Sequence, residues 1–265
     1  MTEWYEWRDL PRADYAVIGD PVSHSKSPDM QNAAFKSRGL PSQYVAVRVP
    51  QDDFVPAIRA LEHAGYVGLN VTVPLKEAAY DWADGGDSRI GATNTIRIED
   101  RQSINTDAPG FLSTLRDLAI EPCQVLVLGA GGTSRSLCVA LCDAGFEVAV
   151  FNRNQERARQ LKDQSRCPIE LLVSPDPKGR SLIVNATSAS LKNECPDLVW
   201  ANLDPEAFAY DVMYGERTSP FLSKAAEHGL RSCDGLPLLL AQGALSFEWW
   251  TGLEAPIEEM KQALA

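Results

Sequence analysis

Residues 123–153 contain a glycine-rich turn between two short apolar runs, a pattern that few folds accommodate. The first run, Cys123–Leu128, is too short for a helix and rich in residues that favour strands. The turn, Gly129-Ala-Gly-Gly132, leads into apolar residues at helical spacing, and Gly145 stands where a helix C-terminal cap is expected. A second apolar run, 148–151, follows. The order strand, glycine turn, helix, strand predicts a βαβ unit of a nucleotide-binding sheet.

The turn is expected to bind a pyrophosphate through its backbone. Amide groups and the dipole at a helix N-terminus favour an anion there. Ser134 occupies the third glycine position of the G-x-G-x-x-G fingerprint, and an isolated glycine turn can also be only a tight turn, so the flanking strands and helix carry this interpretation. The residues assigned to the phosphate contact are Gly129, Ala130, Gly131, Gly132 and Thr133.

The residues after the second apolar run indicate which nucleotide is bound. Enzymes that use NAD usually place a carboxylate here, on the ribose hydroxyls, whereas this chain has Asn152 and Arg153, with Arg157 one helical turn later. A carboxylate would repel a 2′-phosphate, and a guanidinium can hold it with charge-assisted hydrogen bonds. The alternative is that both arginines lie on a solvated helix face. The pattern favours NADP over NAD as the cofactor.

Composition and charge limit the classes of partner. The chain has 265 residues, 45% of them hydrophobic and 23% charged, as expected for a globular protein. A net charge of −11 argues against nucleic acid and anionic membranes as partners. There is no membrane-length apolar run and no signal-peptide core, which predicts a cytoplasmic protein. Six cysteines without a CxxC pair and three histidines predict buried free thiols and no metal site.

Strands alternate with helices along the whole chain, which predicts an α/β fold with open, mostly parallel, twisted sheets. The βαβ unit begins so late that the first hundred residues need a sheet of their own. We therefore expect two domains, the second a Rossmann-type NADP-binding domain. Local signals predict a first strand over 15–19, a helix capped by Ser27, another capped by Asp52, and a strand over 91–98.

Three polar clusters precede the nucleotide-binding unit, each expected at the C-terminal end of a strand, where open α/β sheets bind ligands. Two hydroxyls before a helix suit a small carboxylate. A lysine just past a strand can serve as acid or base, and a nearby carboxylate would make the two titrate as a unit. Single residues of this kind are usually surface loop, but together they predict an oxidoreductase. The clusters are Ser25 with Ser27; Asn70, Thr72 and Lys76; and Asn94, Asn105, Thr106 and Asp107.

A series of motifs in the same order, from about residue 17 to 252, resembles the shikimate dehydrogenase family. The motifs are Gly19-x-Pro21-x-x-His24-Ser25-x-Ser27-Pro28, Asn70-Val-Thr72-Val-Pro74-x-Lys76, Gly91-Ala-x-Asn94-Thr95, Asn105-Thr106-Asp107, Gly129-Ala-Gly131-Gly132, Asn152-Arg153, Asn185-Ala-Thr187-Ser188 and Gln242-Gly-Ala. The resemblance implies NADPH-dependent, reversible reduction of 3-dehydroshikimate to shikimate. It also implies a substrate-binding domain over 1–107, an NADP-binding domain over 108–235, and C-terminal helices over 236–265 that return to the substrate domain.

The resemblance further implies a role for each matching residue. Lys76 and Asp107 match the catalytic pair, and Ser25 and Ser27 the carboxylate anchors. The other substrate ligands it implies are Thr72, Asn94, Tyr214 and Gln242. The cofactor contacts it implies, besides the glycine turn and Arg157, are Asn152, Arg153, Thr187, Met213 and Gly235. The partners expected are therefore small molecules, with a monomer or a homodimer as the assembly.

The chain departs from the family pattern at a few positions. Gln31 replaces a frequent histidine, Ser103 a frequent glycine, and Pro237-Leu238 the usual Gly-Met beside the nicotinamide pocket. None of these changes touches Lys76 or Asp107. Two alternatives stay open: a quinate/shikimate dehydrogenase with relaxed substrate or NAD use, and a non-catalytic sensor of NADP or a shikimate-like ligand. A sensor need not keep a proton-transfer pair.

Overall fold

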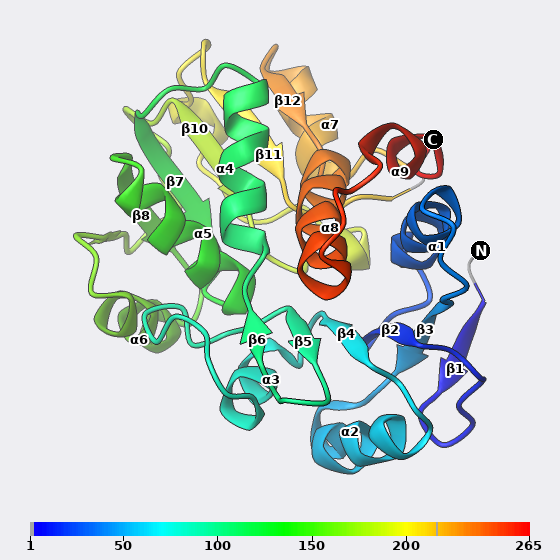
Figure 1. Cartoon of the computed structure of the whole chain (residues 1–265). Helices are drawn as coiled ribbons and strands as arrows, with labels where there is room; N and C mark the ends of the chain where they lie inside the picture. The colour runs from blue at the N-terminus through cyan, green and yellow to red at the C-terminus, as the bar shows by residue number, and fades with distance from the viewer. Residues whose placement is uncertain (1–2, 216) are drawn as a thin grey trace. The chain divides into compact units, whose positions relative to one another are not determined.

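The computed structural model describes residues 3–215 and 217–265, which form two compact units (Figure 1). Unit 1 comprises the described residues up to Asp87 together with Gly91–Gly110 and Leu239–Ala265. Unit 2 comprises Ser88–Ile90 and Phe111–Leu238. Unit 1 is therefore built from segments on both sides of unit 2 in the sequence. The chain leaves it within helix α4 (Asp107–Asp117) and returns within helix α8 (Leu236–Thr251).

The sheet of unit 1 has six strands in the order β1-β3-β2-β4-β5-β6. The first four in that order are parallel, whereas β5 runs antiparallel to both β4 and β6. The mostly parallel sheet expected from the sequence is thus confirmed, with an antiparallel edge. The strands are β1 (Trp4–Glu6), β2 (Tyr15–Gly19), β3 (Tyr44–Arg48), β4 (Gly68–Val71), β5 (Thr95–Arg97) and β6 (Ser103–Ile104).

Alternation along each strand gives the unit 1 sheet two covered faces, because successive side chains point to opposite sides. Ile18 and Leu69 pack with α2 and α3 on one face. On the other, Tyr15 stacks on Phe35 of α1 and lies against Trp250 of α8, with ring centroids 4.9 Å apart in both pairs. The remaining helical elements of unit 1 are α1 (Ser27–Ser37), the 3-10 turn η1 (Gln51–Asp53), α2 (Phe54–His63), α3 (Lys76–Trp82) and α9 (Ile257–Gln262).

The sheet of unit 2 is entirely parallel, in the order β12-β11-β10-β7-β8-β9. Renumbered from β7, this is the 6-5-4-1-2-3 order of the doubly wound dinucleotide-binding fold, whose topological switch point lies between β7 and β10. The expected Rossmann-type fold is confirmed. The strands are β7 (Gln124–Leu128), β8 (Glu147–Phe151), β9 (Glu170–Leu171), β10 (Leu182–Asn185), β11 (Phe208–Asp211) and β12 (Arg231–Cys233).

Helices cover both faces of this second sheet. Val125 and Val127 of β7 face α4, α5 and α6, whereas Leu126 and Leu128 face α7. Side-chain caps begin two of these helices: Asn154 accepts from the amides of α6, and Ser219 accepts from that of α7, each contributing about 1 kcal/mol. The helical elements are α5 (Gly132–Asp143), α6 (Gln155–Ser165), α7 (Pro220–Glu227) and the 3-10 turns η2 (Ser190–Lys192) and η3 (Trp200–Asn202).

Several local predictions are wrong in detail. Ser27 is the first residue of α1, not its cap, and its amide instead donates to Oγ of Ser25 at 3.3 Å. Asp52 lies in a 3-10 turn before α2, so it does not cap that helix. The strand expected over 91–98 is only Thr95–Arg97, because the preceding residues form the loop that carries Asn94. The first strand is β1, ahead of the one expected at 15–19.

The six cysteines are free, but only Cys138 is buried, and Cys195 is exposed. The expectation of six buried thiols is therefore wrong, since four of the side chains reach the boundary of the unit 2 core without entering it. Burial raises the pKa of Cys233 to about 11 and that of Cys142 to about 12. In the described ranges, no helix has the length and apolar character needed to cross a bilayer.

Candidate functional site

Four chain segments meet at one edge of the unit 1 sheet. The segments after β2 and β4 lie at the carboxyl ends of neighbouring parallel strands, and that after β6 lies at the same edge because two antiparallel steps restore the direction. Asn94 precedes β5 and so reaches this edge from the amino end of an antiparallel strand. The prediction that its cluster follows a strand is wrong for Asn94 and right for Asn105 to Asp107.

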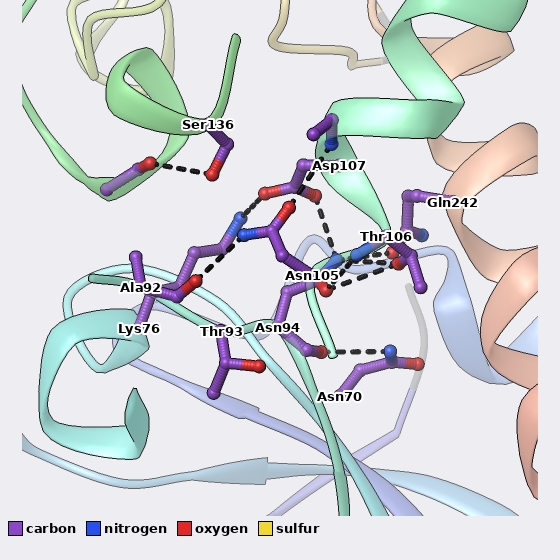
Figure 2. A network of polar contacts seen from close by, with 12 residues as sticks. Asn70, Lys76, Ala92, Thr93, Asn94, Asn105, Thr106, Asp107, Ser136 and Gln242 are labelled. Carbon is purple, nitrogen blue, oxygen red and sulfur yellow. Dashed lines mark hydrogen bonds and ion pairs between the residues drawn. The ribbon is translucent and has the colours of Figure 1, made fainter. Parts of the chain in front are cut away.

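Lys76 and Asp107 form a buried ion pair at this edge (Figure 2). Nζ of Lys76 donates to Oδ2 of Asp107, and the side chains are 11% and 7% exposed. Both residues stand at the first position of a helix, α3 and α4 respectively, so each follows directly from the loop at the sheet edge. A buried charge is retained when it is paired and hydrogen-bonded. The geometry gives a positioned ammonium group with a fixed counter-charge.

Asn94 hydrogen-bonds the oxygen of Asp107 that is not paired with Lys76. Its Nδ2 donates to Oδ1 of Asp107 and to Oγ1 of Thr106, both at 2.9 Å, and lies 3.2 Å from Oε1 of Gln242. The amide of Thr106 in turn donates to Oδ1 of Asn94 at 2.8 Å. Lys76, Asn94, Asp107 and Gln242, all predicted site residues, are thus brought together by direct contacts (Figure 2).

A second, fully buried layer of polar groups lies below Asn94. Nδ2 of Asn70 lies within hydrogen-bond distance of the carbonyl of Asn94 at 3.1 Å and of Oγ of Ser246 at 3.0 Å. The hydroxyl of Tyr44 donates to Oδ1 of Asn70 at 2.7 Å. Ser246 also contacts Thr95 at 2.8 Å, so α8 is hydrogen-bonded to β4 and to β5. These contacts fix the position of α8, and therefore of Gln242, relative to the unit 1 sheet.

The expected carboxylate anchors lie at the same edge, in the segment after β2. Ser25 and Ser27 are both buried; Ser27 is the first residue of α1, and Ser25 lies just before this helix. Thr72 follows β4, the neighbour of β2, and its amide donates to the carbonyl of Ile18 at 2.9 Å. A Cβ on Gly19 would lie 2.4 Å from the methyl of Thr72, so only glycine at position 19 allows this close approach. The three hydroxyl residues share the edge with the ion pair.

The glycine turn of unit 2 has the form that a pyrophosphate requires. Gly129 has φ of +113°, and a Cβ there would meet the carbonyl of Ala186 at 2.9 Å. Gly131 immediately precedes α5, and a Cβ on it would meet nothing within 4 Å, so its backbone is open to a ligand. Ser134, at the third glycine position, fits because its buried hydroxyl donates to the Ala186 carbonyl at 3.3 Å. The residues present therefore fit a dinucleotide phosphate.

The residues after β8 fit an additional phosphate group. Arg153 and Arg157 are exposed, and across residues 3–215 and 217–265 neither has a carboxylate partner. Asn154 orients this segment, because its Oδ1 accepts from the amide of Arg157 at 3.2 Å. Asn152 is half-buried and donates to the Asn154 carbonyl at 2.8 Å. Two uncompensated guanidinium groups beside a helix N-terminus make a cationic site in an otherwise acidic chain.

The other predicted cofactor residues lie beyond β10, β11 and β12, at the carboxyl edge of the same sheet. Thr187 is held by Asn185, whose Oδ1 accepts from its hydroxyl at 2.7 Å. Met213 and Gly235 are joined by a backbone hydrogen bond of 3.0 Å, and a Cβ on Gly235 would overlap the carbonyl of Val212. Tyr214 is half-buried and belongs to unit 2, whereas the other predicted substrate residues belong to unit 1. Within the described chain, no cluster of three metal-ligating side chains occurs.

Three family models match successive parts of the chain. The shikimate dehydrogenase substrate binding domain matches residues 17–96, shikimate/quinate 5-dehydrogenase matches 114–174, and the shikimate 5′-dehydrogenase C-terminal domain matches 235–265. The NADP(+)-dependent shikimate dehydrogenase of Thermus thermophilus is 41% identical, over 94% of this chain and 96% of its own. The chain belongs to the shikimate dehydrogenase family.

Solved structures of this family have the same fold. The shikimate dehydrogenase of Aquifex aeolicus superposes with a TM-score of 0.85 at 35% identity, over 94% of this chain and 96% of the other. The Thermus thermophilus shikimate 5-dehydrogenase, solved in complex with NADP(H) and shikimate, gives a TM-score of 0.83 at 36% identity, over 94% and 97%. The resemblance to this family drawn from the sequence motifs is confirmed.

Some of the polar residues that hold this shikimate dehydrogenase site together escaped the sequence analysis. Ser246 lies one helical turn after Gln242 in an otherwise apolar stretch of α8, a spacing that places the two on one face. Asp211 ends the apolar strand β11, opposite Asn185 of β10, which the motifs already include. Polar side chains at the carboxyl ends of buried strands are a usable signal, because they mark the ligand-binding edge of a parallel sheet.

Proposed function

We propose that this protein is an NADP-dependent shikimate dehydrogenase, which reversibly reduces 3-dehydroshikimate to shikimate with NADPH. The observation that carries the proposal is the buried Lys76–Asp107 pair with Asn94 on its free oxygen, in a chain of this family. Relatives named for this activity and a structural neighbour solved with NADP(H) and shikimate support it.

Lys76 is proposed as the proton donor and acceptor. When bound, NADPH supplies the hydride that reduces the substrate carbonyl. As the carbonyl oxygen gains negative charge, the ammonium of Lys76 stabilises it and donates a proton. Asp107 holds the lysine in place, and its second oxygen, anchored by Asn94, orients a substrate hydroxyl. In the reverse direction, a neutral Lys76 removes the proton from the hydroxyl of shikimate.

The remaining unit 1 residues are proposed to fix the substrate. The hydroxyls of Ser25 and Ser27, with the amides at the start of α1, bind the carboxylate. Thr72, Asn94 and Gln242 contact the ring hydroxyls and the carboxylate region, and Tyr214 is proposed as a further substrate ligand. Unit 1 therefore acts as the substrate-binding domain, in line with the domain roles expected from the sequence.

Unit 2 is proposed to bind NADP. The turn Gly129–Thr133 binds the pyrophosphate, and Asn152, Arg153 and Arg157 bind the 2′-phosphate of the adenosine. Thr187 and Met213 border the nicotinamide, since they follow β10, which lies at the switch point, and its neighbour β11. Gly235 joins them through its hydrogen bond to Met213. We further propose that the protein works in the cytoplasm as a monomer or a homodimer, without a nucleic-acid or membrane partner.

Initial rates with shikimate and with quinate, each against NADP⁺ and NAD⁺, test the proposal. The expected result is rapid reduction of NADP⁺ by shikimate and much slower rates in the other three combinations. Comparable rates with quinate or NAD⁺ would instead identify a quinate/shikimate dehydrogenase of relaxed specificity. Tight binding of NADPH without turnover on either substrate would identify a sensor. The Lys76→Ala variant, assayed in parallel, controls for contaminating dehydrogenases.

A further inference from the structure

Asp211 is a buried carboxylate that the proposed reaction does not use. It ends β11 in unit 2 and is completely inaccessible to solvent. Nowhere between residues 3 and 215, or after 216, does it have a cationic partner, and burial raises its pKa above the usual range. An unpaired buried carboxylate lowers stability, and apolar replacements of buried charges are often as stable or more so. Core stability alone therefore does not account for an aspartate here.

The hydrogen bonds of Asp211 fill both of its oxygens. Oδ2 accepts from the hydroxyls of Ser190 at 2.6 Å and Ser219 at 2.7 Å. Oδ1 accepts from Nδ2 of Asn185 at 3.2 Å and from the amide of Met213 at 3.0 Å. The four donors come from the end of β10, the η2 turn after it, the residues after β11 and the start of α7. One carboxylate thus joins four separate backbone segments.

Two of these segments carry residues assigned to the nicotinamide side of the cofactor. Asn185, held by Asp211, accepts from the amide of Thr187 at 3.1 Å and from its hydroxyl at 2.7 Å. Met213 is held directly, and its carbonyl accepts from the amide of Gly235 at 3.0 Å. The chain from Asp211 therefore reaches Thr187, Met213 and Gly235 through at most one intermediate residue each. All three lie outside helices and strands, and although Met213 also packs against the edge of the unit 2 core, their backbone is held by these hydrogen bonds.

We propose that Asp211 is a positioning residue for NADP, which holds the loops after β10 and β11 in the arrangement that the nicotinamide half of the cofactor requires. The inference rests on the proposed use of NADP. A carboxylate suits this role because it accepts four hydrogen bonds at once, which no neutral side chain of its size does. Charge-assisted bonds are also stronger than neutral ones, so both loops keep their shape before the cofactor arrives.

The experiment compares three variants of the full chain. Asp211→Asn keeps the size of the side chain but places a donor where a serine hydroxyl or the Met213 amide already donates. Ser190→Ala removes one link to the half-buried η2 turn and should fold normally. Thr114→Val is the matched control, since Thr114 is also buried in unit 2 and its hydroxyl contacts the Phe111 carbonyl and the Tyr210 hydroxyl, neither of which bonds Asp211.

The dissociation constant of NADPH, measured by nucleotide fluorescence, is the first readout. We expect it to rise about tenfold in Asp211→Asn, to rise by a smaller factor in Ser190→Ala, and to stay unchanged in Thr114→Val. The double variant Asp211→Asn/Ser190→Ala should bind NADPH as weakly as Asp211→Asn alone, because Ser190 acts through its hydrogen bond to Asp211. Shikimate binding to the protein without nucleotide should be unaffected throughout.

Amide hydrogen exchange without any ligand is the second readout, and it does not depend on the proposed function. Exchange at Thr187, Ala189 and Met213 should accelerate in Asp211→Asn and stay at the parent rate in Thr114→Val. Unchanged exchange, or an unchanged NADPH dissociation constant beside a lowered melting temperature, would overturn the positioning role. If the parent protein did not bind NADPH, the proposed function would fail first, and this inference with it. If Asp211→Asn did not fold, Ser190→Ala would decide by both readouts.

Discussion

Asn94 donates a 2.9 Å hydrogen bond to Oδ1 of Asp107, the carboxylate oxygen that is not paired with Lys76. The carboxylate is therefore held from both sides, and its plane cannot turn without breaking one of the two contacts. Asn94 is held in turn by the amide of Thr106 at 2.8 Å. The ion pair thus has one orientation in unit 1, as proton transfer to a bound substrate requires.

Replacing either member of the pair should lower turnover while leaving the fold intact. We expect Lys76→Ala to lower kcat by roughly 10²–10⁴, the range for a positioned acid or base. Asp107→Asn should lower it as well, and the double variant should lose less than the product of the single losses. The control is Lys36→Ala, an exposed lysine of α1. Near-normal turnover of Lys76→Ala would show that the lysine only binds substrate.

Arg153 should determine the preference for NADP⁺ over NAD⁺. Its exposed guanidinium lies beside the N-terminus of α6, and a charge-assisted contact to the 2′-phosphate is worth about 1.5–3 kcal/mol. Arg153→Ala should therefore raise KM for NADP⁺ by about one to two powers of ten and leave KM for NAD⁺ nearly unchanged. Arg159→Ala, an exposed arginine within α6 that is paired with Glu156, is the control. Equal efficiency with both cofactors in the parent protein would contradict this prediction.

Thr72 should contribute to the choice between shikimate and quinate. Quinate has an extra hydroxyl at the carbon that bears its carboxylate, and a different ring pucker, so it needs more room beside the anchors. The Thr72 methyl lies directly over Gly19 and narrows the space beside the carboxylate anchors Ser25 and Ser27. One methyl discriminates by only about 1–3 kcal/mol. We expect at least about a tenfold preference for shikimate in kcat/KM, and a smaller one in Thr72→Ser. A gap unchanged by Thr72→Ser would remove the methyl from the explanation.

Asp211 should make the free energy of unfolding depend on pH. Because burial raises its pKa above the value of 3.8, the folded chain takes up this proton more readily than the unfolded chain. The contribution is therefore largest below pH 3.8 and is lost as the pH rises through the folded-state pKa. The urea midpoint of the parent, compared with that of Asp211→Asn, should fall across this window and then level off. A difference that is the same at every pH would rule the effect out.

Signals confined to a few neighbouring residues predicted most of the fold. The glycine turn, the apolar runs around it and Gly145 are local, and they located β7, α5 and β8 correctly. The strand β1 was missed because three residues carry no periodicity, and it exists only by pairing with β3, where Trp4 lies opposite Ala46. Helix α9 carries no local signal either, and only the family resemblance implied C-terminal helices there; its six residues pack against α1.

The site was predictable to the extent that its residues stand in motifs. Lys76 and Asp107 were chosen from separate motifs, and their contact joins residues 31 positions apart. The direction from which Asn94 enters was not predictable, because it depends on β5 being antiparallel to β4. The contact between Ser246 and Asn70, which are 176 positions apart in the sequence, was equally unpredictable. Sequence patterns specify which side chains are polar at an edge but not which long-range pairs they form.

The discontinuous build of unit 1 has a consequence for how the protein is made. Its contacts between Asn94 and Gln242 join residues 148 positions apart, so the lysine–aspartate edge cannot be completed until α8 has left the ribosome. Unit 2 is continuous apart from three residues, and its core already contains Phe111 and Leu238. Once it folds, the two ends of the inserted segment are held together, which removes most of the loop-closure entropy that unit 1 would otherwise face. We therefore expect unit 2 to act as an internal folding template that forms first during synthesis, and the lysine–aspartate edge of unit 1 to be completed last.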